Sequence, residues 1–257
     1  MQDKDFLGYF GRLELISTKS DQENIAAIKQ SSTNIINTLL ALTTKVGRKR
    51  SESQDSKGEK EDKKEKKKGA DRTAAMMQKY STGDLGKDMT PDLNYTIKRL
   101  VRGLTSDTSS TKKGFFFASV QVYARFAQQI NCFKLLQHVV KLTKTSKTNM
   151  KNPEINALNM GQMLTLSAVV ESGLCLQIQN QHDTLMLLGK QLVTIYEECQ
   201  YLRESVKMIL EKLLVKAKGA SSAPQLMKLI VKDLHIDADN NRIKMSHPDH
   251  VSMMLSL

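Results

Sequence analysis

Apolar residues recur at intervals of three and four along nearly the whole chain, whereas strict alternation of apolar and polar residues is rare. An interval of three to four residues matches the turn of an α-helix, and a period of two would indicate strands. The pattern therefore predicts an all-α protein. The expected helices cover, in chain order, residues 4–18, 22–46, 91–104, 112–130, 132–145, 153–174, 184–199, 202–217 and 224–234, followed by one that begins near Ser246.

The start of the helix expected at residue 91 is the best marked in the sequence. Thr90 is a favoured N-cap residue, Pro91 suits the first helical position, and Asp92 places a negative charge in the first turn. Gly103 falls near the last turn of the same helix. By the same reasoning, Asp183 is expected to cap the helix that follows it.

About ten helices joined mostly by short connections predict an armadillo- or HEAT-like α-solenoid of helical hairpins. No exact repeat recurs at a fixed period, so a compact helical bundle stays open as the alternative. Residues 1–46 are expected to form the first hairpin, and residues 91–257 the helical-repeat region. An apolar helical pattern still runs at Leu257, which is an unusual end for a solenoid, so we expect the N-terminal part of a longer one.

Residues 47–69, GRKRSESQDSKGEKEDKKEKKKG, interrupt this pattern with ten basic and six acidic residues and no apolar one. A segment without apolar residues buries too little surface to offset its loss of conformational entropy. We therefore expect a disordered basic insertion over residues 47–90. The interspersed acidic residues argue against a dedicated DNA-binding arm, because they repel phosphate.

The same segment contains two basic clusters about a dozen residues apart, which is the arrangement of a bipartite nuclear-localisation signal. A solvated tether between two helices is the alternative interpretation. The candidate signal residues are Arg48, Lys49, Arg50, Lys63, Lys64, Lys66, Lys67 and Lys68.

Charge and cysteine content narrow the class of protein further. The net charge is +12 and the pI about 9.5, and residues outside 47–69 still carry 29 basic against 21 acidic side chains, which favours polyanionic partners. Cys132, Cys175 and Cys199 lie far apart without a C-x-x-C pair, which indicates neither a disulfide framework nor a zinc site. We expect a reducing compartment, and no apolar run suggests a membrane span.

Two basic patches are candidates for binding the phosphates of DNA or RNA. In the first, positions four apart share a helix face, but a solvated face opposite the core stripe is the alternative. Neither patch has aromatic residues for base stacking, so any binding should be independent of base sequence and sensitive to salt. The first patch comprises Lys98, Arg99 and Arg102 with Lys112 and Lys113, and the second Lys141, Lys144, Lys147 and Lys151.

The sequence contains no convincing catalytic or metal site. Asp237, Asp239 and Asn241, close after Asp233, resemble the start of an EF-hand loop, but Arg242 stands at the sixth position, where that loop has Gly. Pro248 stands where the loop ends in a bidentate Glu. We interpret this stretch as a solvated turn.

Other patterns also lack the residues that their chemistry needs. His247 and His250 lie three apart but have no third ligand nearby, and Lys87 lacks the spacing of a phosphate-binding P-loop. A G-x-S-x-G nucleophile motif is absent from the sequence. We expect no catalysis, no cofactor and no small-molecule substrate.

Several stretches carry a resemblance to a known family. They are DFLGYFGRL, DLNYTIKRLVRGLTSD, KKGFFFASVQVYARF, LTLSAVVESGLCLQ and SHPDHVSMMLSL. The chain resembles the N-terminal region of the nucleolar family called DNA polymerase V, DNA polymerase phi or Myb-binding protein 1A. The most specific positions are Tyr95, Lys98, Arg99, Leu100, Gly103 and Leu104, then Gly114-Phe115 and Ser172-Gly173.

The resemblance implies a helical-repeat scaffold in the nucleus and nucleolus that contributes to ribosomal RNA synthesis or ribosome assembly and contacts proteins and DNA or chromatin. The chain departs from the family in the loop TSDTSSTKKG, which lacks the usual arginines, and in residues 47–69, which look like an insertion. A DNA-directed DNA polymerase, as the family name suggests, and a transport or adaptor solenoid are the alternatives. The polymerase alternative would depend on Asp237 and Asp239.

Overall fold

The computed structural model describes residues 21–52, 85–86, 89–106, 108–146, 152–178 and 180–233. In these residues all regular structure is helical, with eight α-helices, two short 3-10 helices and no strand, which confirms the all-α prediction. None of the described helices has an apolar stretch long enough to cross a membrane. The α-helices are α2 (Asp21–Glu52), α4 (Pro91–Gly103), α5 (Ser109–Arg125), α6 (Cys132–Ser146), α7 (Asn152–Glu171), α8 (Gln181–Glu198), α9 (Arg203–Ala217) and α10 (Ala223–Asp233).

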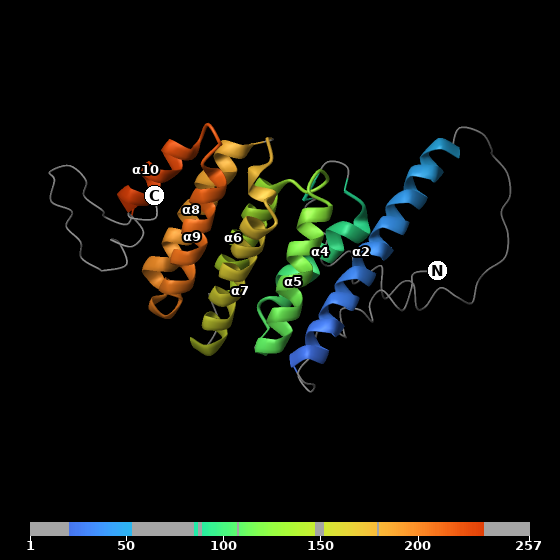
Figure 1. Cartoon of the computed structure of the whole chain (residues 1–257), viewed down its shortest axis with the longest axis horizontal. Helices are drawn as coiled ribbons and strands as arrows, with labels where there is room; N and C mark the ends of the chain where they lie inside the picture. The colour runs from blue at the N-terminus through green and yellow to red at the C-terminus, as the bar shows by residue number, and fades with distance from the viewer. Residues whose placement is uncertain are drawn as a thin grey trace.

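The helices lie in two rows, one in which α6, α8 and α10 contact one another in turn and the other in which α2, α5, α7 and α9 do (Figure 1). Helix α4 contacts α2, α5 and α7. Consecutive helices pair between the rows, so that α4 packs on α5, α6 on α7, and α8 on α9. Within the second row, α5 also contacts both α2 and α7. One continuous hydrophobic core runs between the rows, from Ile28 of α2 to Ile230 of α10.

The start of α4 agrees with the prediction from sequence. Thr90 is the N-cap, and its side-chain oxygen accepts a hydrogen bond from the backbone N–H of Leu93 at 3.3 Å. The predicted cap of α8 is wrong. The capping position is Asn180, which has a left-handed φ of 57°. Asp183 lies in the first turn, where its negative charge interacts favourably with the helix dipole and stabilises α8.

The predicted disorder of residues 47–90 is wrong at both ends of that range. Helix α2 continues to Glu52, because Arg, Lys and Glu are good helix formers even without an apolar face. At the other end, Leu85 is buried, and its carbonyl accepts a hydrogen bond from the N–H of Asn131 at 2.8 Å. Residues 53–84, the helix expected at 4–18 and the one expected near Ser246 lie outside the described residues.

Two glycines allow α4, α5 and α7 to approach one another closely. A Cβ atom on Gly103 would lie 2.1 Å from Cδ1 of Phe115, whose ring is fully buried, so this pair fixes how α4 meets α5. A Cβ atom on Gly161 of α7 would lie 2.6 Å from Cγ2 of Thr105, in the turn after α4. Two of the positions that carry the family resemblance, Gly103 and Phe115, are therefore packing residues.

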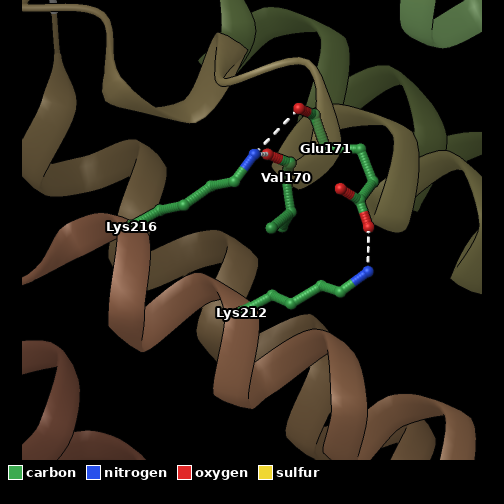
Figure 2. A network of polar contacts seen from close by, with 4 residues as sticks. All are labelled: Val170, Glu171, Lys212 and Lys216. Carbon is green, nitrogen blue, oxygen red and sulfur yellow. Dashed lines mark hydrogen bonds and ion pairs between the residues drawn. The ribbon is translucent and has the colours of Figure 1, made fainter.

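The C-terminal end of α7 is held by two lysines of α9 (Figure 2). Lys216 Nζ donates to the carbonyls of Val170 and Glu171, each at 2.8 Å, and Lys212 forms an ion pair with the Glu171 carboxylate. These carbonyl groups belong to the last turn of α7, where carbonyls have no hydrogen-bond donor within their own helix. Gly173 then ends the helix with a φ of 74°, a conformation that glycine adopts without strain.

Candidate nucleic-acid interface

Helix α4 buries more of its surface than the sequence predicts. Leu93, Ile97, Leu100 and Leu104 are fully buried, as expected for the core stripe. Lys98, however, is only 6% exposed, so neither the predicted phosphate-binding face nor the alternative of a solvated face holds for this residue. The reason is that α2, α5 and α7 all pack against α4, which widens its buried arc beyond the apolar stripe.

Helix α6 carries basic residues and one half-buried histidine on the same side. Lys134 and Lys141 are exposed, and His138 lies between them along the helix. Residues three and four apart are neighbours on a helical surface, so the three side chains share one face of α6.

His138 lies where the charges of α4 and α6 act together. Burial lowers the pKa of His138 below its ordinary value of 6.5, and the positive charges of Lys98, Lys141 and Arg102 lower it further. Each of these cations disfavours a further positive charge on the ring. The structure therefore brings together residues from both basic patches of the sequence. We call Lys98, Arg102, His138 and Lys141 the His138 cluster.

The members of the cluster differ in accessibility. Arg102 and Lys141 are exposed, whereas Lys98 is buried. The prediction from sequence missed His138. Its spacing of three from Lys141 could have placed it beside that lysine, but its approach to α4, some 40 positions earlier in the chain, depends on how the helices pack.

The other predicted binding residues lie apart from this cluster or outside the described residues. Arg99 is half-buried on α4, and Lys112 and Lys113 belong to the first turns of α5. The charges of these three residues are not among those that lower the pKa of His138. Lys144 belongs to the last turn of α6, while Lys147 and Lys151 lie outside the described residues. Of the candidate localisation residues, Arg48, Lys49 and Arg50 belong to the end of α2, and Lys63, Lys64, Lys66, Lys67 and Lys68 lie outside the described residues.

The described part of the chain contains no cluster of three or more His, Cys, Asp or Glu side chains placed to hold a metal ion. Its three cysteines are buried free thiols. Burial raises the pKa of Cys175 to about 11 and that of Cys132 well above its ordinary value, which keeps both protonated and unreactive. The EF-hand-like residues Asp237, Asp239 and Asn241, and also His247, His250 and Lys87, lie outside the described residues.

The fold and the cluster define a class of protein: an all-helical protein of stacked helices with basic residues on α4 and α6. A family model described as DNA polymerase phi matches residues 95–257, which include the whole cluster. The chain belongs to the DNA polymerase phi family, which confirms the resemblance seen in its sequence. No curated protein matches the chain, and neither does any solved structure. The family name suggests a nuclear protein, but the name alone is not evidence of catalysis.

Proposed function

We propose that the chain is a non-catalytic helical-repeat scaffold of the nucleolus. It contributes to ribosomal RNA transcription or ribosome biogenesis, and it binds other proteins and nucleic acid. The observation that carries this proposal is the match to the DNA polymerase phi family over residues 95–257, joined to the basic cluster within the matched region.

The arrangement of helices supports a solenoid of the armadillo or HEAT kind. Each of the hairpins α4–α5, α6–α7 and α8–α9 packs on the next, and a single core runs along the stack. Such stacks present long rows of helices on which partner proteins dock. The proposed protein-binding surfaces are therefore the outward faces of the two rows.

The His138 cluster supports contact with nucleic acid through its phosphates. Arg102 of α4 and Lys141 of α6 are exposed cations, and the charge of the buried Lys98 would add to the attraction for an approaching phosphate. Such contacts do not read base sequence and weaken as the salt concentration rises. The cluster is therefore suited to holding a nucleic acid on the scaffold.

Binding is tested by neutralising the two exposed cations together. We expect Arg102→Gln/Lys141→Gln to bind RNA more weakly and to lower the slope of log affinity against log salt by roughly 0.7 for each lost contact. The matched control is Lys228→Gln/Lys232→Gln, which removes the same charge from the exposed surface of α10. Equal loss in the two double variants would mean that net charge, and not the cluster, determines binding.

Localisation tests the nucleolar part of the proposal. The tagged protein is imaged against a nucleolar marker, with and without replacement of Lys63, Lys64, Lys66, Lys67 and Lys68 by Gln, which leaves the described helix α2 intact. Nucleolar signal that depends on these lysines supports both the compartment and the localisation signal. A diffuse cytoplasmic signal from the wild-type protein contradicts the nucleolar proposal.

The absence of catalysis is a separate part of the proposal, and it rests on the sequence, in which no pattern fits a two-metal polymerase site. It is tested by primer extension with deoxynucleotides and Mg²⁺. If the purified protein extends the primer, and if Asp237→Ala or Asp239→Ala abolishes that extension, the polymerase alternative is established instead.

A further inference from the structure

Helices α5, α7 and α9 present apolar side chains on the side turned away from the helices packed behind them. The three lie side by side in one row, with α4, α6 and α8 behind (Figure 1). On α9, Met208 and Val215 lie two turns apart and are 54% and 67% exposed. Half-buried apolar residues on the two neighbouring helices are Phe116, Phe117 and Val120 of α5 and Met160 and Leu164 of α7. We call these seven residues the apolar face.

Contacts on the opposite sides of α5 and α7 fix the direction of this face. Gln162 of α7 donates from Nε2 to Oε1 of Gln191 of α8 at 3.2 Å, so Met160 and Leu164, two positions away on either side, point away from α8. Phe115 of α5 lies where a side chain on Gly103 of α4 would stand, so Phe117 points away from α4.

The apolar face has the composition of a protein–protein contact and little net charge. Phenylalanine and methionine are enriched at the centres of such contacts. Within one turn of the face lie four lysines, Lys112, Lys113, Lys212 and Lys218. Three glutamates oppose them: Glu204, Glu211 and Glu171, the last paired with Lys212 (Figure 2). The balance is +1 on a chain of net charge +12, so two copies can meet at this face without strong repulsion.

The size of the face suits a stable dimer. Packed helices are about 8–10 Å apart, so three of them span about 25–30 Å. The shortest, α9, has 15 residues and is about 22 Å long at about 1.5 Å per residue. The flat area is therefore about 600 Å², and the side chains that project from it increase the accessible area. A standard interface buries about 800 Å² on each partner.

We propose that the apolar face is the contact between two copies of this chain, related by a two-fold axis parallel to α7. The inference rests on the proposed protein-binding role of the outward faces and names the partner for one of them. With this axis, α5 of one copy lies over α9 of the other, so Phe116 and Phe117 cover the exposed Met208 and Val215. Because α5 and α9 run in the same direction (Figure 1), the lysines in the first turns of α5 face Glu204 at the start of α9.

The test is sedimentation equilibrium of the whole chain after nuclease treatment, which removes any nucleic acid that could bridge two molecules. We expect a reversible monomer–dimer equilibrium at micromolar concentration. Raising the salt concentration should leave the dimer intact or tighten it, because salt screens the repulsion between two basic chains. Contact with nucleic acid should weaken under the same change.

Charged substitutions on α9 locate the contact. Met208→Glu/Val215→Glu places four carboxylates in the dimer interface and should raise the dissociation constant by more than about tenfold. Both side chains are exposed, so the urea midpoint should stay near that of the wild type. The matched control is Met227→Glu/Lys228→Gln, which lowers the net charge equally on exposed positions of α10 and should leave the dimer unchanged.

A second variant tests the centre of the face. Ser167 lies one turn from Leu164 on α7, and Ser167→Glu should also weaken the dimer. A wild-type chain that stays monomeric, or that associates only before nuclease treatment, overturns the proposal. Equal weakening in the α10 control assigns the association to net charge and overturns it as well. These outcomes leave the RNA contact of Arg102 and Lys141 to its own test.

Discussion

Replacement of Gly103 by Ala tests whether the contact of α4 with α5 depends on the missing side chain. The new Cβ atom would lie 2.1 Å, 2.3 Å and 2.4 Å from three carbons of the Phe115 ring. Real Cβ atoms do not approach other heavy atoms this closely, so either the ring or α4 must move. Because Phe115 is fully buried, movement of the ring also displaces core neighbours.

The expected cost follows from two opposing effects. Overpacking a well-filled core costs about 1–3 kcal/mol, whereas Gly→Ala within a helix gains at most about 1 kcal/mol of helix propensity. Gly103 is the last residue of α4, where the propensity gain is smaller than in a helix interior. We therefore expect Gly103→Ala to lower the free energy of unfolding by roughly 1–2 kcal/mol, which corresponds to about 2–8 °C in the melting temperature of a domain of this size.

Urea unfolding followed by circular dichroism measures this change. The control is Gly219→Ala, since a Cβ atom there meets nothing within 4 Å, and we expect it to stay within about 0.5 kcal/mol of the wild type. Trimming the ring in Gly103→Ala/Phe115→Leu should cost less than the sum of the single changes, because the smaller side chain relieves the clash. A Gly103→Ala variant as stable as the wild type would refute the reasoning.

Three further predictions concern the end of α7 and the charge of His138. Gly173→Ala should destabilise the fold by about 1 kcal/mol, because φ is 74° at this position. Gly173→Asn should destabilise it by less, because asparagine adopts the left-handed conformation more readily than alanine. Equal urea midpoints for Gly173→Ala and the wild type would contradict this. Lys216→Met removes two hydrogen bonds to the α7 carbonyls and should lower the free energy of unfolding in urea by about 1.5–3 kcal/mol. Lys212→Gln loses a partly exposed ion pair with Glu171 and should lower it by less than about 1 kcal/mol. The reverse order would be evidence against a role of Lys216 in holding the end of α7. The pKa of His138 is lower in the folded than in the unfolded chain, so the unfolded state binds more protons. The contribution of His138 to stability should therefore be complete above pH 6.5 and be lost as the pH falls through the folded pKa. Thermal melts of His138→Gln should show a smaller loss of stability at low pH, and a pH profile equal to that of the wild type would contradict this.

The sequence predicts elements far better than it predicts the contacts between them. The period of apolar residues and the Thr90–Pro91 start place α4 within a residue of its observed bounds. The burial of Lys98 could not be predicted in this way, because it arises from neighbouring helices that enclose α4 and not from the pattern of α4 itself. The cap of α8 was misplaced because Asn and Asp are both good caps, and only the backbone decides between Asn180 and Asp183.

The motif that carries the family resemblance combines packing and charge in a way that separates fold from function. Leu100, Gly103 and Leu104 shape the contact of α4 with its neighbours, and changes there should be read as changes in stability. Arg102 lies between these positions and is exposed, so a change there should alter the proposed anion site while the core stays intact. A variant that loses RNA binding but keeps its urea midpoint should therefore map to Arg102 or Lys141, whereas one that loses both should map to the packing positions.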